Sequence, residues 1–423
     1  MFYRFLYNLF LPLLWLGFRI LGVFNRKVAA GIRGRRGLFR NLEEQLSRLR
    51  PGRRRIWFHS ASLGEFEQAK PIIGELRRRH NDLDIIVSFF SPSGYEHVRS
   101  SDFADLVTYV PFDSPGNARR FVRMLNPSTA VFLRYDVWPN HLGALRRLGA
   151  PTFVVSATIR SAAARRIPPI RAFYRSLYNM LDYVLASSEP DKQVFEAMRL
   201  THPVLDVVGD TRYDQVVARS QASRQRPVLA GELVRGRKVF VIGSSWKEDE
   251  DVLVPACCDF LRAHDEFLVV VAPHEPTPEH LDRLERLLGS DGKVIRYSIL
   301  PDYGGEPFII IDNVGMLMSL YQHAHIAYVG GGFRTGIHNV LEPAAYGIPI
   351  LIGPDHGNSR EAMMLVDEGA AFVGQTGFDF YQHLERLLGD ERTRDTAGGK
   401  ALAHVCGNTG ATAKFIEYLE REL

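Results

Sequence analysis

The feature that most constrains the fold of this chain is an alternation of short apolar runs with amphipathic stretches, and this alternation occurs twice. Helical patterns such as Glu65–Arg79 and Pro115–Leu125 separate apolar runs in the first half. Apolar strands joined by crossover helices are typical of a parallel sheet covered on both faces. The predicted strands of the first set are Ile56–Phe58, Ile85–Phe89, Leu106–Tyr109, Thr129–Phe132, Thr152–Val155, Tyr183–Ala186 and Val204–Val208.

The same alternation restarts after a polar segment, Ala218–Gly236, which lacks strong periodicity and is predicted to be a linker. We expect an α/β protein with two doubly wound, Rossmann-like domains, residues 25–217 and 218–423, and a ligand cleft between them at the carboxyl ends of the strands. The last helix is a candidate to pack back on the first domain. The second set of predicted strands is Lys238–Ile242, Phe267–Val271, Lys293–Arg296, Phe308–Ile311, Ile326–Val329 and Ile350–Ile352.

The N-terminal segment is predicted to be a membrane anchor helix over residues 1–24. Phe5–Phe18 carries no charge and, extended to Phe24, approaches the roughly 20 residues that a spanning helix needs. Residues 1–55 hold thirteen Lys or Arg and two Glu. A basic cluster after an apolar helix with aromatic residues indicates a helix at or across a membrane, with its C-terminal side cytoplasmic. The alternatives are a buried core helix followed by a charged linker, and a nucleic-acid patch.

The cysteine and histidine patterns indicate no metal site. Three cysteines, Cys257, Cys258 and Cys406, cannot form a disulfide framework, which favours a reducing compartment. No C-x-x-C pair occurs, and Pro278 stands where an H-E-x-x-H motif beginning at His274 would need its second histidine.

Polar residues follow the first predicted strand, at the turn into a helix. Ser62 is placed to cap that helix, and Glu65, three residues later, would complete a capping box. The functional interpretation makes Glu65 a general base facing the ligand crevice. A helix N-terminus stabilises a carboxylate and weakens it as a base, whereas loss of solvent acts in the opposite direction.

A glycine run, Gly330–Gly332, follows the predicted strand Ile326–Val329. Glycines allow backbone N–H groups to approach a phosphate, although such runs also serve packing alone. Thr335 occupies the third glycine position of a dinucleotide fingerprint, and no G-x-x-x-x-G-K-[ST] motif occurs. The pattern is therefore typical of a nucleotide-phosphate loop that is neither a Rossmann fingerprint nor a P-loop.

Taken together, these segments resemble the 3-deoxy-D-manno-octulosonic acid (Kdo) transferase family. The combination of S-x-G-E and H-N-x-L-E-P-A at this separation is highly specific. The resemblance runs through Asn25-Arg26-Lys27, Gly34-Arg35-Arg36, Trp57–Glu65, Trp138-Pro139-Asn140, Gly209–Asp214, Gly243-Ser244-Ser245, Pro273-His274, Val329-Gly330-Gly331, His338–Ala344, Gly353-Pro354 and Asn358.

The resemblance implies a GT-B fold, an N-terminal anchor on the cytoplasmic face of the inner membrane, CMP-Kdo as donor and a lipid A precursor as acceptor. It implies no metal, no cofactor and no nucleic acid. The residues that would bind the acceptor stay unknown, as do the number of Kdo residues transferred and the oligomeric state.

Roles carry over from the family residue by residue. Glu65 is the family's catalytic base, and Asp136 stands before W-P-N, where many relatives have Glu. Arg212 would meet the donor phosphate, and Glu342 would hold the ribose hydroxyls. Many relatives have Arg between the proline and histidine that are adjacent here, and many have Glu where Met316 stands. The implied donor-binding residues are Arg212, Ser244, Ser245, Pro273, His274, Gly315, Met316, Leu317, Gly331, Asn339 and Glu342.

The stereochemistry is expected to be inverting. Retaining GT-B enzymes often carry two glutamates eight residues apart. Counted from Glu342, the second position here is Ile350. Two alternatives stay open: another GT-B cell-envelope enzyme using a UDP- or GDP-sugar, such as a UDP-sugar epimerase, and a non-catalytic membrane-associated nucleotide-binding protein.

Overall fold

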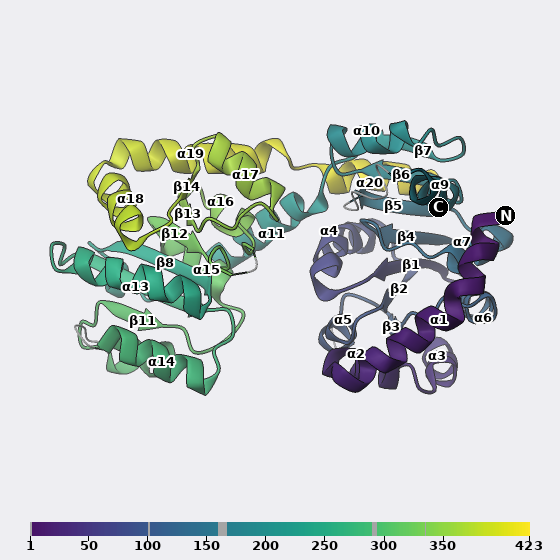
Figure 1. The fold of residues 1–423 in the computed structure, drawn as a ribbon, viewed down its shortest axis with the longest axis horizontal. Helices are drawn as coiled ribbons and strands as arrows, with labels where there is room; N and C mark the ends of the chain where they lie inside the picture. Colours follow the sequence, from purple (N-terminus) through teal and green to yellow (C-terminus); the bar gives the residue numbers. More distant parts are fainter. Residues whose placement is uncertain (1, 100–101, 160–166, 290–293, 335) are drawn as a thin grey trace. The chain divides into compact units, whose positions relative to one another are not determined.

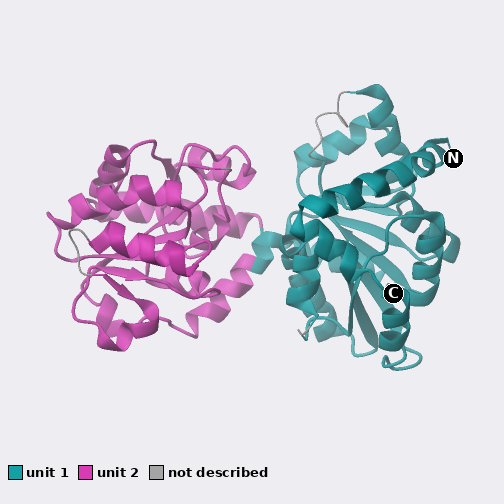
Figure 2. Ribbon diagram, turned by 60° about the horizontal axis from the view of Figure 1, so that its bottom comes forward, with its two compact units in different colours: residues 1–215, 409–423 teal, residues 216–408 magenta. Residues whose placement is uncertain are grey.

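A computed structural model describes residues 2–99, 102–159, 167–289, 294–334 and 336–423. The chain divides into two compact units, which Figure 2 colours separately. Unit 1 comprises residues 1–215 and 409–423, and unit 2 comprises residues 216–408. Both units are doubly wound α/β structures, so the predicted fold class is confirmed.

Unit 1 contains a parallel seven-stranded sheet in its described part, in the order β3-β2-β1-β4-β5-β6-β7. The chain builds outward from β1 to β3 and then returns to the other side of β1 with β4, so the strand order reverses between β1 and β4. The strands are β1 (Arg54–Ser60), β2 (Leu83–Phe89), β3 (Leu106–Tyr109), β4 (Thr129–Leu133), β5 (Thr152–Ala157), β6 (Tyr183–Ala186) and β7 (Val204–Val207).

Helices cover both faces of this sheet (Figure 1). One face carries α4 (Leu63–Arg79), α5 (Pro92–Val98) and α20 (Ala411–Glu420). The other carries α3 (Leu38–Leu46), α6 (Pro115–Leu125), α7 (Pro139–Leu148), α9 (Pro168–Tyr178) and α10 (Glu189–Ala197). In the described part of unit 1 the other helices are α1 (Phe2–Phe24), α2 (Arg26–Gly34) and α11 (Thr211–Arg224).

Unit 2 repeats the plan with strand order β10-β11-β9-β8-β12-β13-β14, so its order reverses between β8 and β12. The strands are β8 (Lys238–Ser245), β9 (Phe267–Pro273), β10 (Val294–Arg296), β11 (Phe308–Ile310), β12 (Ile326–Val329), β13 (Ile350–Ile352) and β14 (Ala371–Val373). The helices are α12 (Gly231–Val234), α13 (Lys247–Leu261), α14 (Pro278–Gly289), α15 (Leu317–Leu320), α16 (Leu341–Ala344), α17 (Arg360–Asp367), α18 (Gly377–Gly389) and α19 (Glu391–Gly407), with 3₁₀ turns Tyr297–Asp302 and Tyr321–His323.

Two details differ from the sequence-based predictions, and one cannot be compared. The edge strand β14 was not among the predicted strands. Helix α11 occupies the first part of the segment predicted to be a linker, up to Arg224, and α12 occupies part of the remainder. Lys293, at the predicted start of β10, lies outside the described residues.

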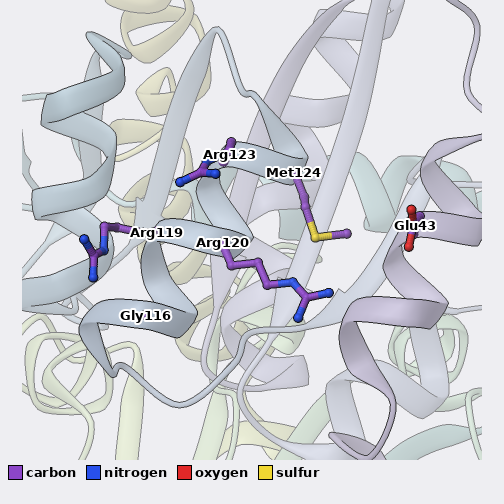
Figure 3. Close-up of a pocket in the computed structure, with 6 residues that line it drawn as sticks. All are labelled: Glu43, Gly116, Arg119, Arg120, Arg123 and Met124. Atoms are coloured by element: carbon purple, nitrogen blue, oxygen red, sulfur yellow. The ribbon is translucent and has the colours of Figure 1, made fainter.

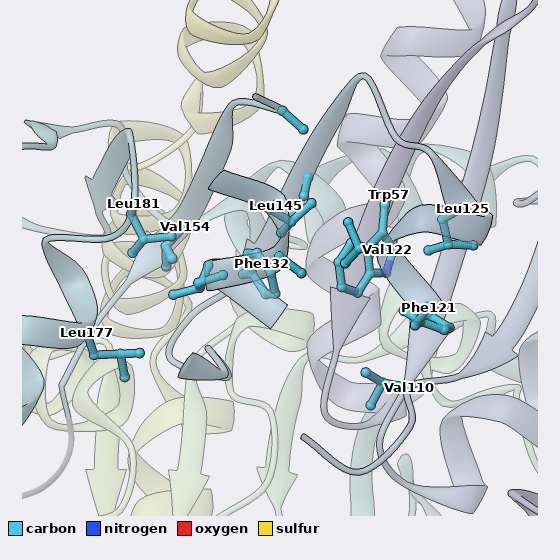
Figure 4. Close-up of a cluster of buried hydrophobic side chains, with 14 of the residues drawn as sticks. Trp57, Val110, Phe121, Val122, Leu125, Phe132, Leu145, Val154, Leu177 and Leu181 are labelled. Atoms are coloured by element: carbon cyan, nitrogen blue, oxygen red, sulfur yellow. The ribbon is translucent and has the colours of Figure 1, made fainter. Parts of the chain in front are cut away.

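Buried side chains alternate between the two faces of the unit 1 sheet. Trp57 and Phe132 belong to one core cluster, which Figure 4 shows, whereas their neighbours Phe58 and Val131 belong to the other. All four side chains are fully buried. The period of two follows from the strand geometry, which directs successive side chains to opposite faces.

Helix α1 lies along unit 1 and none of its residues is buried (Figure 1). One stripe of the helix contacts the unit: Arg4 Nε donates to Asn140 Oδ1 (3.1 Å), and Asn8 and Asn140 exchange side-chain hydrogen bonds (2.7 and 3.3 Å). Arg4 also packs where a Cβ on Gly143 would stand, 2.1 Å from its Nη1. Most of the large apolar side chains of the helix are exposed, namely Phe2, Phe5, Leu6, Leu9, Phe10, Leu13, Leu14, Trp15, Leu16, Ile20, Leu21, Val23 and Phe24.

The last helix, α20, is part of the unit 1 core. Phe415, Ile416 and Leu419 are fully buried in the same cluster as α4, and the ring of Phe415 meets that of Phe153 edge-on at 5.7 Å. Asp214 accepts hydrogen bonds from the backbone N–H groups of Gly410 and Thr412, both at 2.6 Å. The C-terminal segment therefore completes the unit that the N-terminal half begins.

We predict that Phe415→Ala costs about 3–5 kcal/mol of unit 1 stability, because the substitution leaves a cavity in a closed core. The control is Phe378→Ala in unit 2, where the ring is 67% exposed and truncation should cost little. Denaturant unfolding of both variants measures the difference. Equal stability of the two variants would show that α20 does not contribute to the core.

Candidate functional site

Glu65 lies in the first turn of α4, where the chain leaves β1. Its Oε2 accepts a hydrogen bond from the backbone N–H of Ala61 at 2.7 Å, and the residue is 7% exposed. Ser62 occupies the N-cap position, but within the described residues its side chain makes no capping hydrogen bond. The predicted reciprocal capping box is therefore wrong, because the Glu65 carboxylate binds the amide before the cap and the Ser62 hydroxyl binds none of the helix amides.

Asp136 lies in the segment after β4, on the other side of the strand reversal. Its Oδ2 is 2.9 Å from Nε2 of His59, a fully buried residue of β1. Arg134, immediately after β4, holds a left-handed backbone conformation with φ +60°. Since β1 and β4 are adjacent parallel strands, their carboxyl ends bring Glu65, Asp136 and Arg134 to one edge of the sheet.

Burial raises the pKa of Glu65 above its ordinary value. The Ala61 hydrogen bond opposes this shift, the nearby Asp136 carboxylate adds to it, and His59 and Arg134 oppose it. Desolvation thus outweighs the stabilising effect of the Ala61 hydrogen bond on the ionised carboxylate. A carboxylate with a raised pKa is a stronger base than one in water, which suits general-base chemistry.

Arg212 lies at the start of α11 in unit 1, whereas the other predicted donor residues lie in unit 2. Its guanidinium binds the nearly buried Asp210 through Nε at 2.9 Å and Nη2 at 2.7 Å. Burial acts to raise the pKa of Asp210, but Arg212, with help from Arg134, brings it below its ordinary value. An anion near Arg212 would therefore share this guanidinium with Asp210.

In unit 2 the predicted residues gather at the carboxyl ends of the strands. Ser244 and Ser245 end β8, Pro273 ends β9 and His274 follows it, and Gly331 follows β12. Gly315, Met316 and Leu317 lie between β11 and α15, with φ +92° at Gly315, and Asn339 and Glu342 lie at the turn into α16. The residues after β8, β9 and β12 flank the strand reversal of this sheet.

Two of these residues, Ser245 and Gly331, donate hydrogen bonds to buried carboxylates of α13. The Ser245 hydroxyl donates to Glu250 Oε1 at 2.8 Å, and the Gly331 N–H donates to Asp249 Oδ2 at 2.9 Å. Tyr328 Oη also donates to Asp249 at 2.6 Å. Ser245 and Gly331 therefore shape the loops at this edge through these internal bonds, and their predicted role in donor binding stays a prediction.

The glycine run also serves close packing. A Cβ on Gly330 would lie 2.1 Å from the Ser244 carbonyl oxygen, and Gly331 has φ +97°, a conformation that only glycine adopts readily. At the following turn, Asn339 Oδ1 accepts from the Leu341 N–H at 3.2 Å, and Glu342 pairs with Arg219 at 3.1 Å.

The sequence analysis did not single out a stacked cluster of rings at the same edge. Trp246 Nε1 donates to His338 Nε2 at 2.8 Å, and the ring centroids of His274 and His338 are 4.3 Å apart with planes at 17°. The Arg334 guanidinium carbon lies 4.2 Å from the Trp246 ring centroid. Burial lowers the pKa of His338 to about 4, so this histidine is neutral at physiological pH. The cluster presents flat rings with one cation over them.

Within the described residues, no group of three or more His, Cys, Asp or Glu side chains is placed to hold a metal ion. A hollow of about 550 Å³ in unit 1 is lined by Glu43, Gly116, Arg119, Arg120, Arg123 and Met124, and Figure 3 shows its three arginines extending from α6. None of the predicted site residues lines it.

Comparisons with known proteins agree with the arrangement of both units. Residues 32–215 match the family model described as 3-deoxy-D-manno-octulosonic-acid transferase (kdotransferase). The chain is 26% identical over 380 residues to the 3-deoxy-D-manno-octulosonic acid transferase of Haemophilus influenzae, covering 87% of this chain and 88% of the relative. It is 28% identical over 327 residues to that of Chlamydophila psittaci, covering 74% and 73%.

Solved structures share the fold. The UDP-GlcNAc 2-epimerase from Neisseria meningitidis, solved with UDP-GlcNAc, aligns with a TM-score of 0.63 at 16% identity, covering 87% of this chain and 100% of the epimerase. At this identity the likeness establishes the GT-B fold and carries no statement about substrate.

The raised pKa of Glu65 yields a stability prediction. The folded protein binds the Glu65 proton more tightly than the unfolded chain, so this residue's contribution to stability is lost as pH rises through the raised pKa. Glu65→Gln keeps an acceptor oxygen for the Ala61 N–H and removes the charge. We expect the variant to have a higher Tm than the wild type at neutral pH, with the difference vanishing below the ordinary glutamate value of about 4.5.

Glu75, on the same helix, supplies a control of opposite sign. Hydrogen bonds from Arg78 and Arg79 lower the pKa of Glu75 to about 2. Any change in the stability of Glu75→Gln at neutral pH should therefore be a decrease. Thermal unfolding across the pH range measures both variants. A lower Tm for Glu65→Gln at neutral pH would mean that the site stabilises the ionised carboxylate.

Proposed function

We propose that the chain is a Kdo transferase, on the strength of its similarity to such enzymes over most of its length, and that it transfers Kdo from CMP-Kdo to a lipid A precursor in lipopolysaccharide biosynthesis, with inversion at the anomeric carbon. The observation that carries the proposal is the buried Glu65 carboxylate, with its raised pKa, at the strand reversal of unit 1. This residue lies within the part of the chain that the family model matches.

In the proposed reaction Glu65 accepts the proton of the acceptor hydroxyl while the hydroxyl oxygen attacks the anomeric carbon of Kdo. The bond from that carbon to the CMP phosphate oxygen breaks, and CMP leaves with the bonding electron pair. CMP is already a good leaving group, so the protein's tasks are to orient the two substrates, hold the base and stabilise the phosphate. Asp136 is proposed to assist the base from beside it.

Unit 2 is proposed to bind the donor at the edge formed by β8, β9 and β12. Glu342 is proposed to accept hydrogen bonds from the ribose hydroxyls, with Arg219 holding its carboxylate. Ser244, Pro273, His274, Gly315, Met316, Leu317 and Asn339 are proposed to line the donor, while Ser245 and Gly331 hold the loops in shape through Glu250 and Asp249. Arg212 is proposed to contribute positive potential toward the phosphate.

The N-terminal helix is proposed to hold the enzyme on the cytoplasmic face of the inner membrane. It is long and apolar enough to cross a membrane, judged by length and composition. Its polar stripe binds Asn140, while its exposed face is almost wholly apolar. This two-sided character supports a helix that lies in the membrane surface with one face on unit 1.

The function is tested with purified protein, CMP-Kdo and a lipid A precursor, with products identified by mass spectrometry. Glu65→Gln should lower turnover by a factor of ~10²–10⁴ and leave CMP affinity largely unchanged. Glu342→Ala should show the opposite pattern, weakening CMP binding by about 1–3 kcal/mol in calorimetry. Transfer from UDP-sugars but not from CMP-Kdo, or near-normal turnover of Glu65→Gln, would overturn the proposal.

The membrane role predicts the effect of two substitutions on the exposed face of α1. Leu9 and Leu13 are 60% and 64% exposed and lie one turn apart. Replacing both with Gln should weaken binding to anionic phospholipid vesicles at least tenfold, since burying each leucine contributes about 1.5–3 kcal/mol. Turnover on detergent-dispersed acceptor should persist. Ile299→Gln, at a 52% exposed position of unit 2, is the control that should leave vesicle sedimentation unchanged. Unchanged binding of the double variant would contradict the membrane role of this face.

A further inference from the structure

A chain of buried hydrogen bonds leads to the proposed catalytic edge of unit 1. Trp57 Nε1 lies 2.8 Å from Ser88 Oγ, Ser88 Oγ lies 2.8 Å from His59 Nδ1, and His59 Nε2 lies 2.9 Å from Asp136 Oδ2. Trp57, His59 and Ser88 are fully buried, and the Asp136 side chain is 17% exposed. The four residues come from β1, the neighbouring strand β2 and the loop after β4.

The chemistry of the four side chains determines which of them donates in each of these hydrogen bonds. An indole N–H can only donate, so Ser88 Oγ accepts from Trp57. The single hydroxyl proton of Ser88 is then available to His59 Nδ1, which accepts it. His59 therefore carries its own proton on Nε2 and donates it to the Asp136 carboxylate, which can only accept. The tautomer of His59 is set by Ser88 on one side and Asp136 on the other.

We infer that His59 is a positioning residue for the proposed base: by donating from Nε2 it holds the Asp136 carboxylate beside Glu65. This inference deepens the proposed function and rests on it for its catalytic consequence. His59 does not touch the reacting atoms. Its rigid ring is fixed by the Ser88 bond and by edge contacts with Trp57 and Phe132, at centroid distances of 6.2 and 6.0 Å.

The charged and titratable groups around the pair are few. Asp136, His59 and Arg134 act on Glu65, and among these Asp136 has the largest effect and raises the pKa of Glu65. The buried Tyr178 also senses the Asp136 charge. Holding Asp136 in place therefore keeps the proposed base stronger than it would be without this neighbouring carboxylate. If Asp136 turned away, the pKa of Glu65 would fall toward its ordinary value.

Two isosteric amides separate positioning from simple packing. In His59→Gln the side-chain nitrogen can reach the place of Nε2 and still donate to Asp136. In His59→Asn the amide reaches only the place of Nδ1, so contact with Ser88 can persist while Asp136 loses its donor. Both variants are neutral, and both remove the imidazole ring.

The first readout needs no substrate. In each background, the Tm difference between Glu65 and Glu65→Gln is measured as a function of pH, because this difference reports the pKa of Glu65 in the folded protein. We expect the difference at neutral pH to shrink in His59→Asn and to persist in His59→Gln. Equal behaviour of the two amides would overturn the positioning role, whether or not the chain transfers Kdo.

The second readout is the pH dependence of kcat/KM. In His59→Asn the acid limb should move to lower pH and the plateau should fall, because Glu65 becomes a weaker base. In His59→Gln the limb should stay at its wild-type position. A shifted limb in both variants, or in neither, contradicts the inference, whereas absence of Kdo transfer by the wild type would contradict only the proposed function.

Discussion

The reversal of strand order in a parallel sheet is the constraint on which the rest of this structure depends. At such a reversal, the connections that leave two adjacent parallel strands run to opposite sides of the sheet. No crossover then covers the carboxyl ends of these two strands, and a crevice stays open there. Unit 1 has such a place between β1 and β4, and unit 2 has one between β8 and β12. Glu65 and Asp136 in unit 1, and Ser245, Trp246 and Gly331 in unit 2, lie at or just after the ends of strands beside these reversals.

The two units use buried carboxylates at this place in different ways. In unit 2, Asp249 accepts a hydrogen bond from the Gly331 N–H, and Glu250 accepts one from the Ser245 hydroxyl. These two carboxylates therefore stabilise the loops after β8 and β12. In unit 1, Glu65 has one backbone donor and a second carboxylate nearby. Burial raises the pKa of both Asp249 and Glu65, so the raised pKa does not by itself distinguish the two carboxylates. They differ in their donors: Asp249 accepts from Tyr328, Gly331 and Trp246, whereas Glu65 accepts from the Ala61 N–H.

Much of this fold could be predicted because burial leaves a direct trace in sequence. Strands such as Phe267–Pro273 are buried at every residue and read as unbroken apolar runs. Edge strand β14 has three residues, two of them only half-buried, so its run is too short to stand out. The start of α11 in unit 1 and its continuation past Ala218 were missed because the helix is weakly amphipathic, so it has no clear apolar stripe.

The positions of the site residues could be predicted from the sequence, but their hydrogen-bond partners could not. Local spacing predicts Glu65 at the start of a helix. Whether its carboxylate binds the Ala61 N–H or completes a capping box depends on how the surrounding structure buries it. Asp249 looks like an ordinary solvent-exposed acid in the first turn of α13, and only the approach of β12, some eighty residues later, makes it a buried acceptor for Gly331.

The same reasoning explains why α1 has two unlike faces. A helix that only spanned a membrane would gain nothing from Arg4, Asn8 and a partner such as Asn140, since polar groups in a lipid environment are costly. A helix that belonged to the core would bury its leucines, and these are exposed. Hydrogen bonds to Asn140 on one side and exposed hydrocarbon elsewhere fit the proposed arrangement, in which the helix stays on unit 1 while its exposed side chains meet lipid. The glycine at position 143 leaves room for the Arg4 guanidinium, because a Cβ at this position would require that guanidinium to shift.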